Sequence, residues 1–161
     1  MKIQVSHTLA HSEAEKAETY RVTVHAVSYI DRAHYFALAR EVESWYTERT
    51  GLHLEDETDD PEFIALRNLC YYRAEMLASV DRKRTSEGTA YLCEWKNGKE
   101  GAEFERRNLP AEWTTLDGMA DKMPSALFDK WLEATRELNA GVLPTIPDFF
   151  GQATTSRNVI D

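Results

Sequence analysis

The residues of this chain best suited to bind a metal ion are its five histidines. His7 and His11 stand four positions apart, which would bring two imidazoles to one side of a helix. The zinc motif with this spacing, HExxH, needs a glutamate directly after its first histidine, where this chain has Thr8. His25 and His34 lie on different expected elements. We therefore expect ordinary surface or half-buried histidines and no metal site.

The acidic run from Glu55 to Asp60 could offer oxygen ligands to calcium. An EF-hand loop needs ligands at alternate positions, a glycine at the sixth and a glutamate at the twelfth. Ala65 and Leu66 stand in the later part of this stretch, so the motif is absent. The acids are better explained as a solvated loop whose charge favours the start of the helix that follows.

Motifs of catalysis and cofactor binding are absent from the sequence. The chain contains no GxGxxG, GxxxxGK(S/T), GxSxG or CxxC motif. Cys70 lies in an apolar helical stripe and Cys93 in a strand pattern, which indicates two small buried hydrophobes and no disulfide. We therefore expect no enzyme and no cofactor, and binding through a protein surface remains.

Composition narrows the class of protein further. A length of 161 residues with 42% hydrophobic residues favours one domain with a substantial core. No run of about 18 apolar residues and no signal-peptide core are present, so we expect a cytoplasmic protein. The net charge of −9 argues against nucleic acid and anionic lipid as partners. It indicates either simple solubility or an acidic face that imitates DNA and blocks a DNA-binding protein.

A helix from Pro61 to Val80 is the element expected to organise the domain. Asp60 is placed to cap its first free N–H groups, and proline suits the first helical position. Apolar residues cover most of its circumference, which predicts a central helix packed on more than one side. We expect the basic run Arg82-Lys83-Arg84 in its last turn, where positive charge favours the exposed carbonyls.

Two elements are expected before this central helix. Residues Tyr20 to Val27 alternate between apolar and polar side chains, which predicts a half-buried strand. Ser28 with Asp31 three residues later resembles a capping box and predicts the start of a helix that runs to about Thr50. Gly51 is placed to end that helix in a left-handed conformation.

A small β-hairpin and a last helix are expected after the central helix. Thr89 to Lys96 reads as a strand, Asn97-Gly98 is a strong turn signal, and Lys99 to Glu105 can return as the partner strand. Residues 109–122 look irregular or partly helical. Apolar residues at helical spacing predict a helix from Pro124 to Asn139.

The predicted fold class is therefore α+β and predominantly α-helical. We expect a single domain over residues 1–141 with three main helices, an N-terminal strand, a small β-hairpin and an extended or disordered C-terminal tail over residues 142–161. Within residues 1–19, which could as a whole be a mobile arm, Lys2 to Val5 could be a short edge strand, and Ser12 to Thr19 a loose helical turn or a mobile arm.

The C-terminal third of the chain carries a family resemblance. Trp113-Thr114-Thr115-Leu116 is followed by Met123-Pro124-Ser125-Ala126-Leu127-Phe128-Asp129-Lys130-Trp131 and then by Glu137-Leu138-Asn139. This order resembles the tail assembly chaperones and related minor tail proteins of long-tailed bacteriophages. The order of the preceding elements is similar to that of the same family.

The resemblance implies a non-catalytic protein in the bacterial cytoplasm. Such proteins bind the tape-measure protein of the phage tail and help tail-tube subunits to assemble around it. We expect Ile146, Phe149 and Phe150 to form a partner-binding segment, because they are apolar residues in an otherwise polar tail. The alternatives are that this tail packs back on its own domain, and that the protein is an acidic inhibitor or adaptor acting as a decoy for a nuclease or DNA-binding protein.

Overall fold

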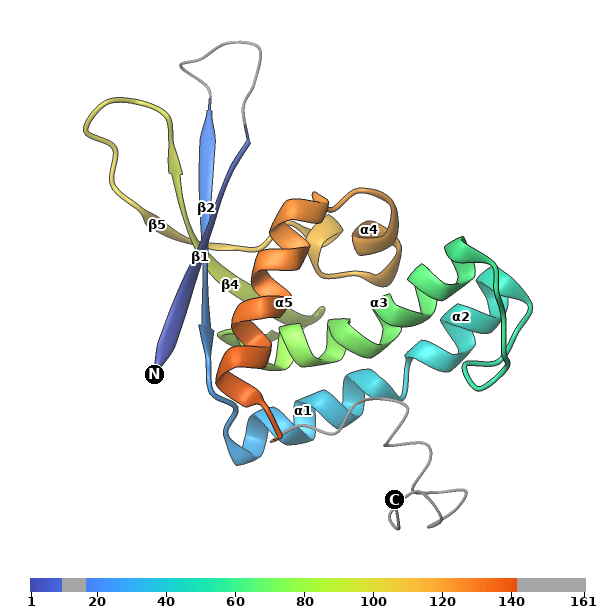
Figure 1. Cartoon of the computed structure of the whole chain (residues 1–161). Coiled ribbons are helices and arrows are strands. Elements are labelled where there is room, and N and C mark those ends of the chain that lie inside the picture. The colour runs from blue at the N-terminus through green and yellow to red at the C-terminus, as the bar shows by residue number, and fades with distance from the viewer. Residues whose placement is uncertain (10–16, 142–161) are drawn as a thin grey trace.

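The computed structural model describes residues 1–9 and 17–141 (Figure 1). Its strands are β1 (Lys2–Leu9), β2 (Glu18–His25), β3 (Arg82–Thr85), β4 (Gly88–Asn97) and β5 (Glu105–Asn108). Its helices are α1 (Tyr29–Ala39), α2 (Val42–Thr50), α3 (Pro61–Ala78), α4 (Leu116–Asp121) and α5 (Ser125–Asn139), with a 3-10 turn at Ala111–Trp113. Figure 1 shows the strands gathered on one side of the molecule and the helices on the other.

The strands of the described residues form one antiparallel sheet with β4 at its centre. β1 pairs with β2 along its whole length, in a register that places Val5 opposite Val22. β4 pairs with β3 near its N-terminal end, with β5 in its middle part and with β2 near its C-terminal end. A bridge between Val24 and Val80 also joins β2 to the segment that leads into β3.

The predicted fold class is wrong in its balance of elements. We expected a predominantly helical domain with one N-terminal strand and a small hairpin, whereas the described residues contain a five-stranded antiparallel sheet. β3 has the sequence Arg-Lys-Arg-Thr, which contains no apolar residue. Its strand conformation depends on backbone pairing with β4, and a local pattern of side chains does not reveal such pairing.

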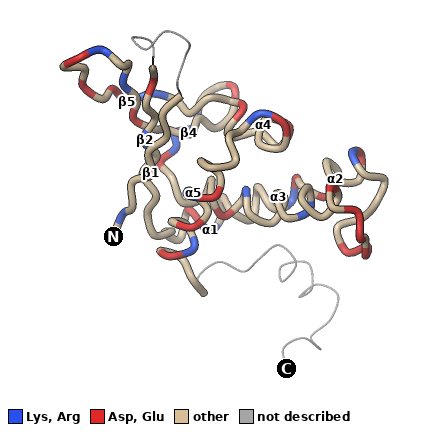
Figure 2. The backbone as a smooth tube through the Cα atoms, turned by 45° about the horizontal axis from the view of Figure 1, so that its top comes forward, with Lys and Arg blue, Asp and Glu red and all other residues tan. Residues whose placement is uncertain are grey.

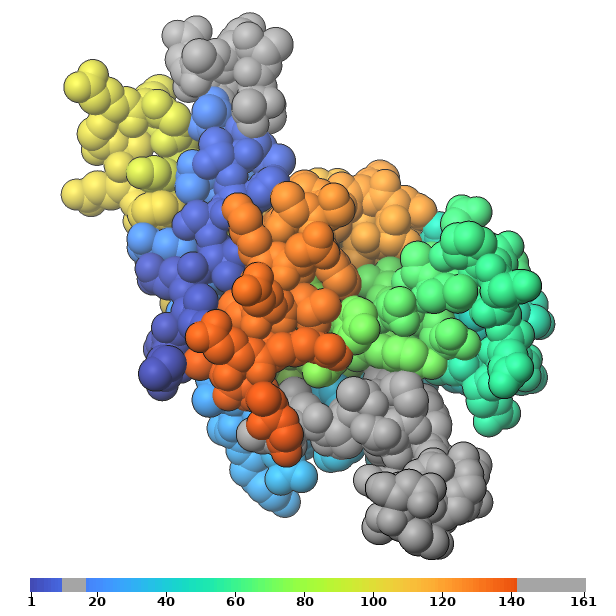
Figure 3. Space-filling model, viewed as in Figure 1, coloured from blue at the N-terminus to red at the C-terminus, as the bar shows by residue number. Residues whose placement is uncertain are grey.

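The sheet packs one face against the helices because apolar side chains alternate along its strands. In β2, Tyr20, Val22 and Val24 are buried, and Arg21 and Thr23 between them are partly exposed. α5 contacts both β1 and β2. Figure 3 shows α5, in orange-red, on the surface between β1, in dark blue, and the green helix α3.

α3 is the central helix, as the sequence predicted, because it contacts α1, α2, α4 and α5. The predicted cap is also confirmed: Asp60 accepts hydrogen bonds from the backbone N–H groups of Glu62 (2.9 Å) and Phe63 (3.3 Å). Cys70, expected to be a buried hydrophobe, is fully buried in α3, and Cys93 is buried in β4; both are free thiols.

The prediction for the run Arg82-Lys83-Arg84 is wrong. α3 ends at Ala78, and the run forms strand β3. The backbone N–H of Leu92 in β4 donates to the carbonyl of Asp81 at 2.8 Å, and this bond holds the chain out of a helical path just before the run. The positive charge of the run therefore lies on the sheet instead of at a helix end.

The prediction of a hairpin at Asn97-Gly98 is wrong in its turn and in the position of its second strand. β4 does pair antiparallel with a following strand, but that strand is β5 (Glu105–Asn108). β4 continues to pair with β2 as far as Asn97, which lies opposite Glu18. A Cβ on Gly98 would lie 2.8 Å from the carbonyl oxygen of Ala17, so glycine serves a close backbone approach here and not a two-residue turn.

The helix expected from Ser28 to Thr50 is two helices, α1 and α2. Near the break, the N–H of Glu41 donates to the carbonyl of Leu38 (3.1 Å), three residues back, which tightens the chain before α2 begins. The predicted start and end are confirmed. Ser28 forms a capping box with Asp31, and Gly51 ends α2 with a φ of 80°.

Two stretches of the N- and C-terminal regions lie outside the described residues. The described residues of 1–19 contain β1 and the start of β2, which confirms a strand at Lys2 to Val5; most of Ser12 to Thr19, the predicted helical turn or arm, lies outside the described residues. β1 is longer than the predicted strand because all eight of its residues pair with β2. Residues 10–16 and the expected tail, residues 142–161, are not described. The described residues contain no helix that is both long and apolar enough to cross a membrane.

Candidate functional site

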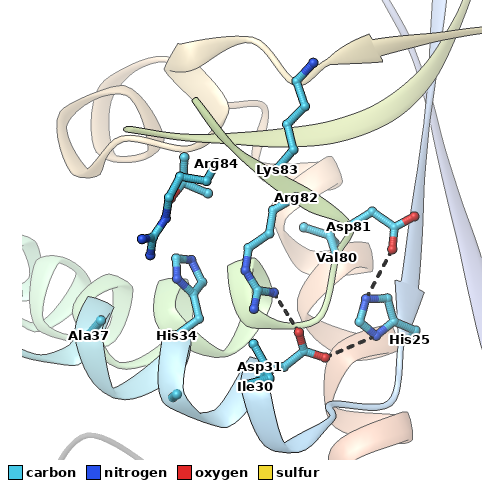
Figure 4. Close-up of a pocket in the computed structure, with 12 residues that line it drawn as sticks. His25, Ile30, Asp31, His34, Ala37, Val80, Asp81, Arg82, Lys83 and Arg84 are labelled. Carbon is cyan, nitrogen blue, oxygen red and sulfur yellow. Dashed lines mark hydrogen bonds and ion pairs between the residues drawn. The ribbon is translucent and has the colours of Figure 1, made fainter. Parts of the chain in front are cut away.

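A groove with a volume of about 600 Å³ lies between α1 and β3 in the described part of the chain (Figure 4). It lies within the size range of about 300–1,000 Å³ that is usual for ligand pockets. Helix α1 forms one wall, strand β3 forms the other, and His25 at the end of β2 closes one end. The groove is lined by His25, Ile30, Asp31, Ala33, His34, Ala37, Val80, Asp81, Arg82, Lys83, Arg84 and Thr89.

The α1 wall is mostly apolar and includes an exposed edge. Ile30, Ala33, His34 and Ala37 recur at helical spacing, so their side chains lie on one face of α1. Ile30 is 66% exposed, and its neighbour Tyr29 is 83% exposed. Large apolar side chains exposed beside a groove are typical of surfaces that contact another molecule.

The β3 wall is cationic because side chains alternate along the strand. Arg82 and Arg84 point toward α1, and the guanidinium of Arg84 lies near the ring of His34 (Figure 4). Lys83, between them, points away from α1. Arg84 is exposed and forms no ion pair with any described residue. The groove therefore presents a free guanidinium next to apolar surface.

A chain of contacts between charged side chains and the His25 imidazole lies at the closed end of the groove. Arg82 lies 2.7 Å from one carboxylate oxygen of Asp31, and the other oxygen of Asp31 lies 3.8 Å from Nδ1 of His25. Nε2 of His25 lies 3.5 Å from Asp81, which in turn lies 3.4 Å from Arg106 of β5. This network joins α1, β2, β3 and β5, so the groove walls are held at a defined separation.

Asp31 has two structural tasks in this network. It accepts a hydrogen bond from the backbone N–H of Ser28 (2.8 Å) as part of the α1 cap, and it pairs with Arg82. Burial raises the pKa of the Asp31 carboxyl, but the hydrogen bonds from Ser28 and Arg82 outweigh burial, and its pKa lies below the usual value. Asp31 is therefore a carboxylate at neutral pH, and it already neutralises Arg82.

His34 is a neutral side chain at physiological pH. Burial, followed by the positive charge of Arg82, lowers its pKa to about 4. Its Nε2 forms a hydrogen bond of 2.6 Å with the hydroxyl of Tyr91. His34 therefore contributes a polar but uncharged surface to the groove.

The depressed pKa of His34 predicts a dependence of stability on pH. The unfolded chain takes up a proton near pH 6.5, whereas folded His34 resists protonation down to about pH 4. Protonation therefore favours the unfolded chain, and the free energy of unfolding should fall as the pH falls from about 6.5 to about 4. NMR titration should place the midpoint of His34 near pH 4. A His34→Gln variant should have a shallower pH dependence in this window, and a midpoint near 6.5 would contradict the burial that we describe.

Arg73 of α3 adds buried positive charge behind the groove. Its side chain is 8% exposed, its Nε donates to the carbonyl of Thr114 at 2.8 Å, and its Nη1 has no hydrogen-bond partner among the described residues. Burial lowers its pKa. The charge of Arg73 also lowers the pKa of His34, so it acts on the groove even though it does not line it.

Comparisons of this chain with protein-family models, curated proteins and solved structures find no match. The interpretation of the groove therefore rests on its own geometry and chemistry. The resemblance to phage tail assembly proteins stays a prediction.

The residues predicted from sequence and the residues of the groove are largely different. Ile146, Phe149 and Phe150, the predicted partner-binding segment, lie outside the described residues. The described part of the chain contains no group of three or more histidine, cysteine or acidic side chains arranged to hold a metal ion. His25 and His34, assigned to separate elements in the sequence, are brought to one groove.

The groove itself was missed by sequence reasoning. The run Arg82-Lys83-Arg84 was noticed and explained by a helix end, so its position opposite α1 was not foreseen. A signal for the other wall was present: Ile30 and Tyr29 directly follow the Ser28 cap, where an amphipathic helix has no need of two adjacent large apolar residues.

Proposed function

We propose that this chain is a non-catalytic protein-binding domain that assists the assembly of phage tails by contacting the tape-measure protein, tail-tube subunits or both. The protein-binding part of this proposal is carried by the groove. It combines the exposed side chain of Ile30 with the unpaired guanidinium of Arg84, and this combination suits a protein segment with apolar and acidic side chains.

The chemistry of the groove favours binding over catalysis. Nε2 of His34 is engaged by Tyr91, and the pKa of about 4 leaves His34 a weak base. Burial raises the pKa of Cys70 to about 12 and that of Cys93 to about 11, so both thiols are poor nucleophiles at neutral pH.

The tail-assembly part of the proposal is supported by the resemblance of residues 113–139. In the structure, Trp113, Leu127, Trp131 and Asn139 of this stretch are all buried. These residues therefore build the domain, and contact with other tail proteins falls to surfaces elsewhere on the chain. We assign that contact to the C-terminal segment containing Ile146, Phe149 and Phe150, and we take the groove to be a second protein-binding surface.

The end of α5 lies close to the groove. The side chain of Asn139 accepts a hydrogen bond from the N–H of Val27 at 2.8 Å and donates to the carbonyl of His25 at 3.4 Å, and His25 lines the groove. The described structure ends at Gly141, two residues beyond Asn139, so its last described residue lies at the same end of the molecule.

Affinity capture from phage-infected cells tests this function. The full chain should retain the tape-measure or tail-tube protein, and a chain that lacks residues 142–161 should lose most of it. The double variant Phe149→Ala, Phe150→Ala should reproduce the loss, because removing two large apolar anchors weakens a typical contact by at least about tenfold. A Thr154→Ala, Thr155→Ala variant of the same segment serves as the control.

Three results would count against this function. Retention of the tail proteins by the truncated chain would remove the role of the C-terminal segment. Recovery of a nuclease or DNA-binding protein in place of tail proteins would support the decoy function instead. Turnover of a small molecule by the purified chain would contradict a purely binding role.

The decoy function has one observation in its favour. The connection between α2 and α3 carries exposed acids, among them Glu55, Glu57 and Asp59. These acids gather on one short stretch and do not form the long ladder that an imitation of the DNA backbone requires. We therefore favour tail assembly over the decoy function.

A further inference from the structure

We propose that the groove between α1 and β3 binds the acidic connection between α2 and α3 of a second copy of this chain. We use the name acidic loop for residues 55–62, which comprise the end of that connection and the first two residues of α3. The inference rests on the proposed function in one respect, because it takes the groove to be a protein-binding surface. It names the partner of that surface as another copy of the same protein.

The acidic loop carries the negative charge that complements the positive charge of the groove. It contains six carboxylates in eight residues: Glu55, Asp56, Glu57, Asp59, Asp60 and Glu62. All of them are exposed except Asp56, which is partly exposed. None forms an ion pair with any residue in the described part of the chain. Figure 2 shows these acids gathered at the end of the molecule where α2 and α3 meet.

The groove offers matching positive charge. Arg84 is exposed on the α1 side of β3 and has no acidic partner among the described residues. Arg82 is already paired with Asp31, and buried Arg73 has no carboxylate within ion-pair distance in the described residues. An incoming carboxylate would therefore meet Arg84 directly and the field of Arg73 behind it.

Apolar contact accompanies the charges on both surfaces. The groove presents Ile30, with Ala33 and Ala37 beside it. The acidic loop is followed at once by Phe63 and Ile64, both partly exposed at the start of α3. Apolar burial next to charge pairs is the usual arrangement of specific protein contacts.

The two surfaces cannot meet within one molecule. The acidic loop lies at the N-terminal end of α3, and the run Arg82-Lys83-Arg84 follows the C-terminal end of α3. α3 has 18 residues and is therefore about 27 Å long at about 1.5 Å per residue. α3 thus acts as a spacer that keeps the acidic loop and the groove apart, so their charges can be paired only between copies.

The contact must overcome the net charge of −9 that each copy carries. Repulsion between whole molecules is screened beyond about 8 Å at physiological salt, whereas directly opposed charges are screened much less. A contact between two unlike surfaces also lets copies join in a row. Such a row would suit a protein that coats a long partner.

Charge reversal on each surface tests the inference. Sedimentation of the full chain over a range of concentrations should show reversible self-association that weakens as salt is raised to about 1 M. Arg84→Glu should weaken it by at least about tenfold, because attraction becomes repulsion at the groove. Lys130→Glu is the matched control: it makes the same charge change at an exposed position of α5 that does not line the groove. It should change the association by less than about threefold.

The acidic loop is tested in the same way. The double variant Glu57→Lys, Asp59→Lys should weaken self-association by at least about tenfold. Asp129→Lys, Glu133→Lys makes an equal charge change on exposed positions of α5 and serves as the control. Circular dichroism of each variant should match the unaltered chain, because all the substituted side chains are exposed.

Mixing the two defective chains gives the sharpest result. Arg84→Glu retains an intact loop, and Glu57→Lys, Asp59→Lys retains an intact groove. Each variant alone should associate more weakly than the unaltered chain, and the mixture should associate more strongly than either variant alone. A mixture that stays monomeric would overturn the inference.

Two further outcomes would also overturn it and leave the proposed function standing. The unaltered chain could remain monomeric at about millimolar concentration. Inorganic phosphate could instead bind the groove, with binding lost in Arg84→Glu and no self-association, which would make the groove a small-anion site. Capture of tail proteins through residues 142–161 is measured separately, so its failure would count against the function and not against this contact.

Discussion

Replacing Trp131 with alanine is expected to lower the free energy of unfolding by about 3–5 kcal/mol. Trp131 lies in α5 and is fully buried. α5 contacts α3 as well as β1 and β2, so this indole fills space where the helical layer meets the sheet. Its removal would leave a cavity that the surrounding sheet and helices can close only in part.

A conservative variant separates the effect of volume from that of hydrogen bonding. The indole Nε1 of Trp131 has no hydrogen-bond partner among the described residues. Trp131→Phe should therefore lose packing but no hydrogen bond, and should cost about 1–2 kcal/mol. Urea unfolding monitored by circular dichroism measures both values. A loss for Trp131→Phe as large as that for alanine would mean that the indole N–H is satisfied and important.

Replacing Asn139 with alanine is expected to lower the free energy of unfolding by about 2–4 kcal/mol. The side chain of Asn139 is almost fully buried and joins three elements. It accepts from the N–H of Val27 (2.8 Å) and donates to the hydroxyl of Ser79 (3.2 Å) and the carbonyls of His25 (3.4 Å) and Thr135 (3.1 Å). Alanine would leave the partly buried Val27 N–H without a partner, which is the most costly consequence.

Asn139→Asp is the informative comparison for this site. Aspartate keeps an oxygen that can accept from Val27 but cannot donate to His25, Ser79 and Thr135. It would also place a charge at a position that is 6% exposed. We expect a loss at least as large as that of alanine, and one that shrinks at low pH as the carboxyl takes up a proton. Full stability of either variant in thermal unfolding would contradict the role of Asn139 in joining these elements through hydrogen bonds.

The position of Asn139 links stability to the proposed site. Its partner His25 lines the closed end of the groove, and its partner Val27 lies two residues before α1 begins. Loss of the Asn139 hydrogen bonds should loosen the start of α1 and thereby the wall that carries Ile30. Variants of Asn139 are therefore expected to weaken self-association as well as folding, whereas the Arg84→Glu variant should weaken self-association alone.

Several elements of this protein were determined by local sequence. The Asp60 and Pro61 pair marks the start of α3, Ser28 and Asp31 mark the start of α1, and Gly51 ends α2. Each of these signals acts between residues no more than three or four positions apart, through backbone groups that are free at helix ends. The alternation along β2 is local in the same sense, and it correctly predicted that Tyr20, Val22 and Val24 are buried, whereas Ala26, expected on the same face, lies beyond the strand and is exposed.

The size of the sheet was decided by contacts that are distant in sequence. β3 is made of charged and polar residues and forms only because β4 is present to pair with it. The Asn97-Gly98 turn signal was overridden because β4 also pairs with β2, which lies more than 70 residues earlier in the chain. Backbone pairing of this kind depends on which strands meet, and side-chain patterns within one strand do not encode it.

The candidate site also depends wholly on contacts between residues that are distant in sequence. The sequence alone showed a basic run and an acidic run, and the helix between them was correctly placed by its cap and apolar pattern. Only the folded structure turned the basic run back along the sheet to face α1, where Arg84 and Ile30 lie on opposite walls of one groove. The physical reason is that helix signals act over a single turn, whereas a groove is made when elements far apart in the chain pack together.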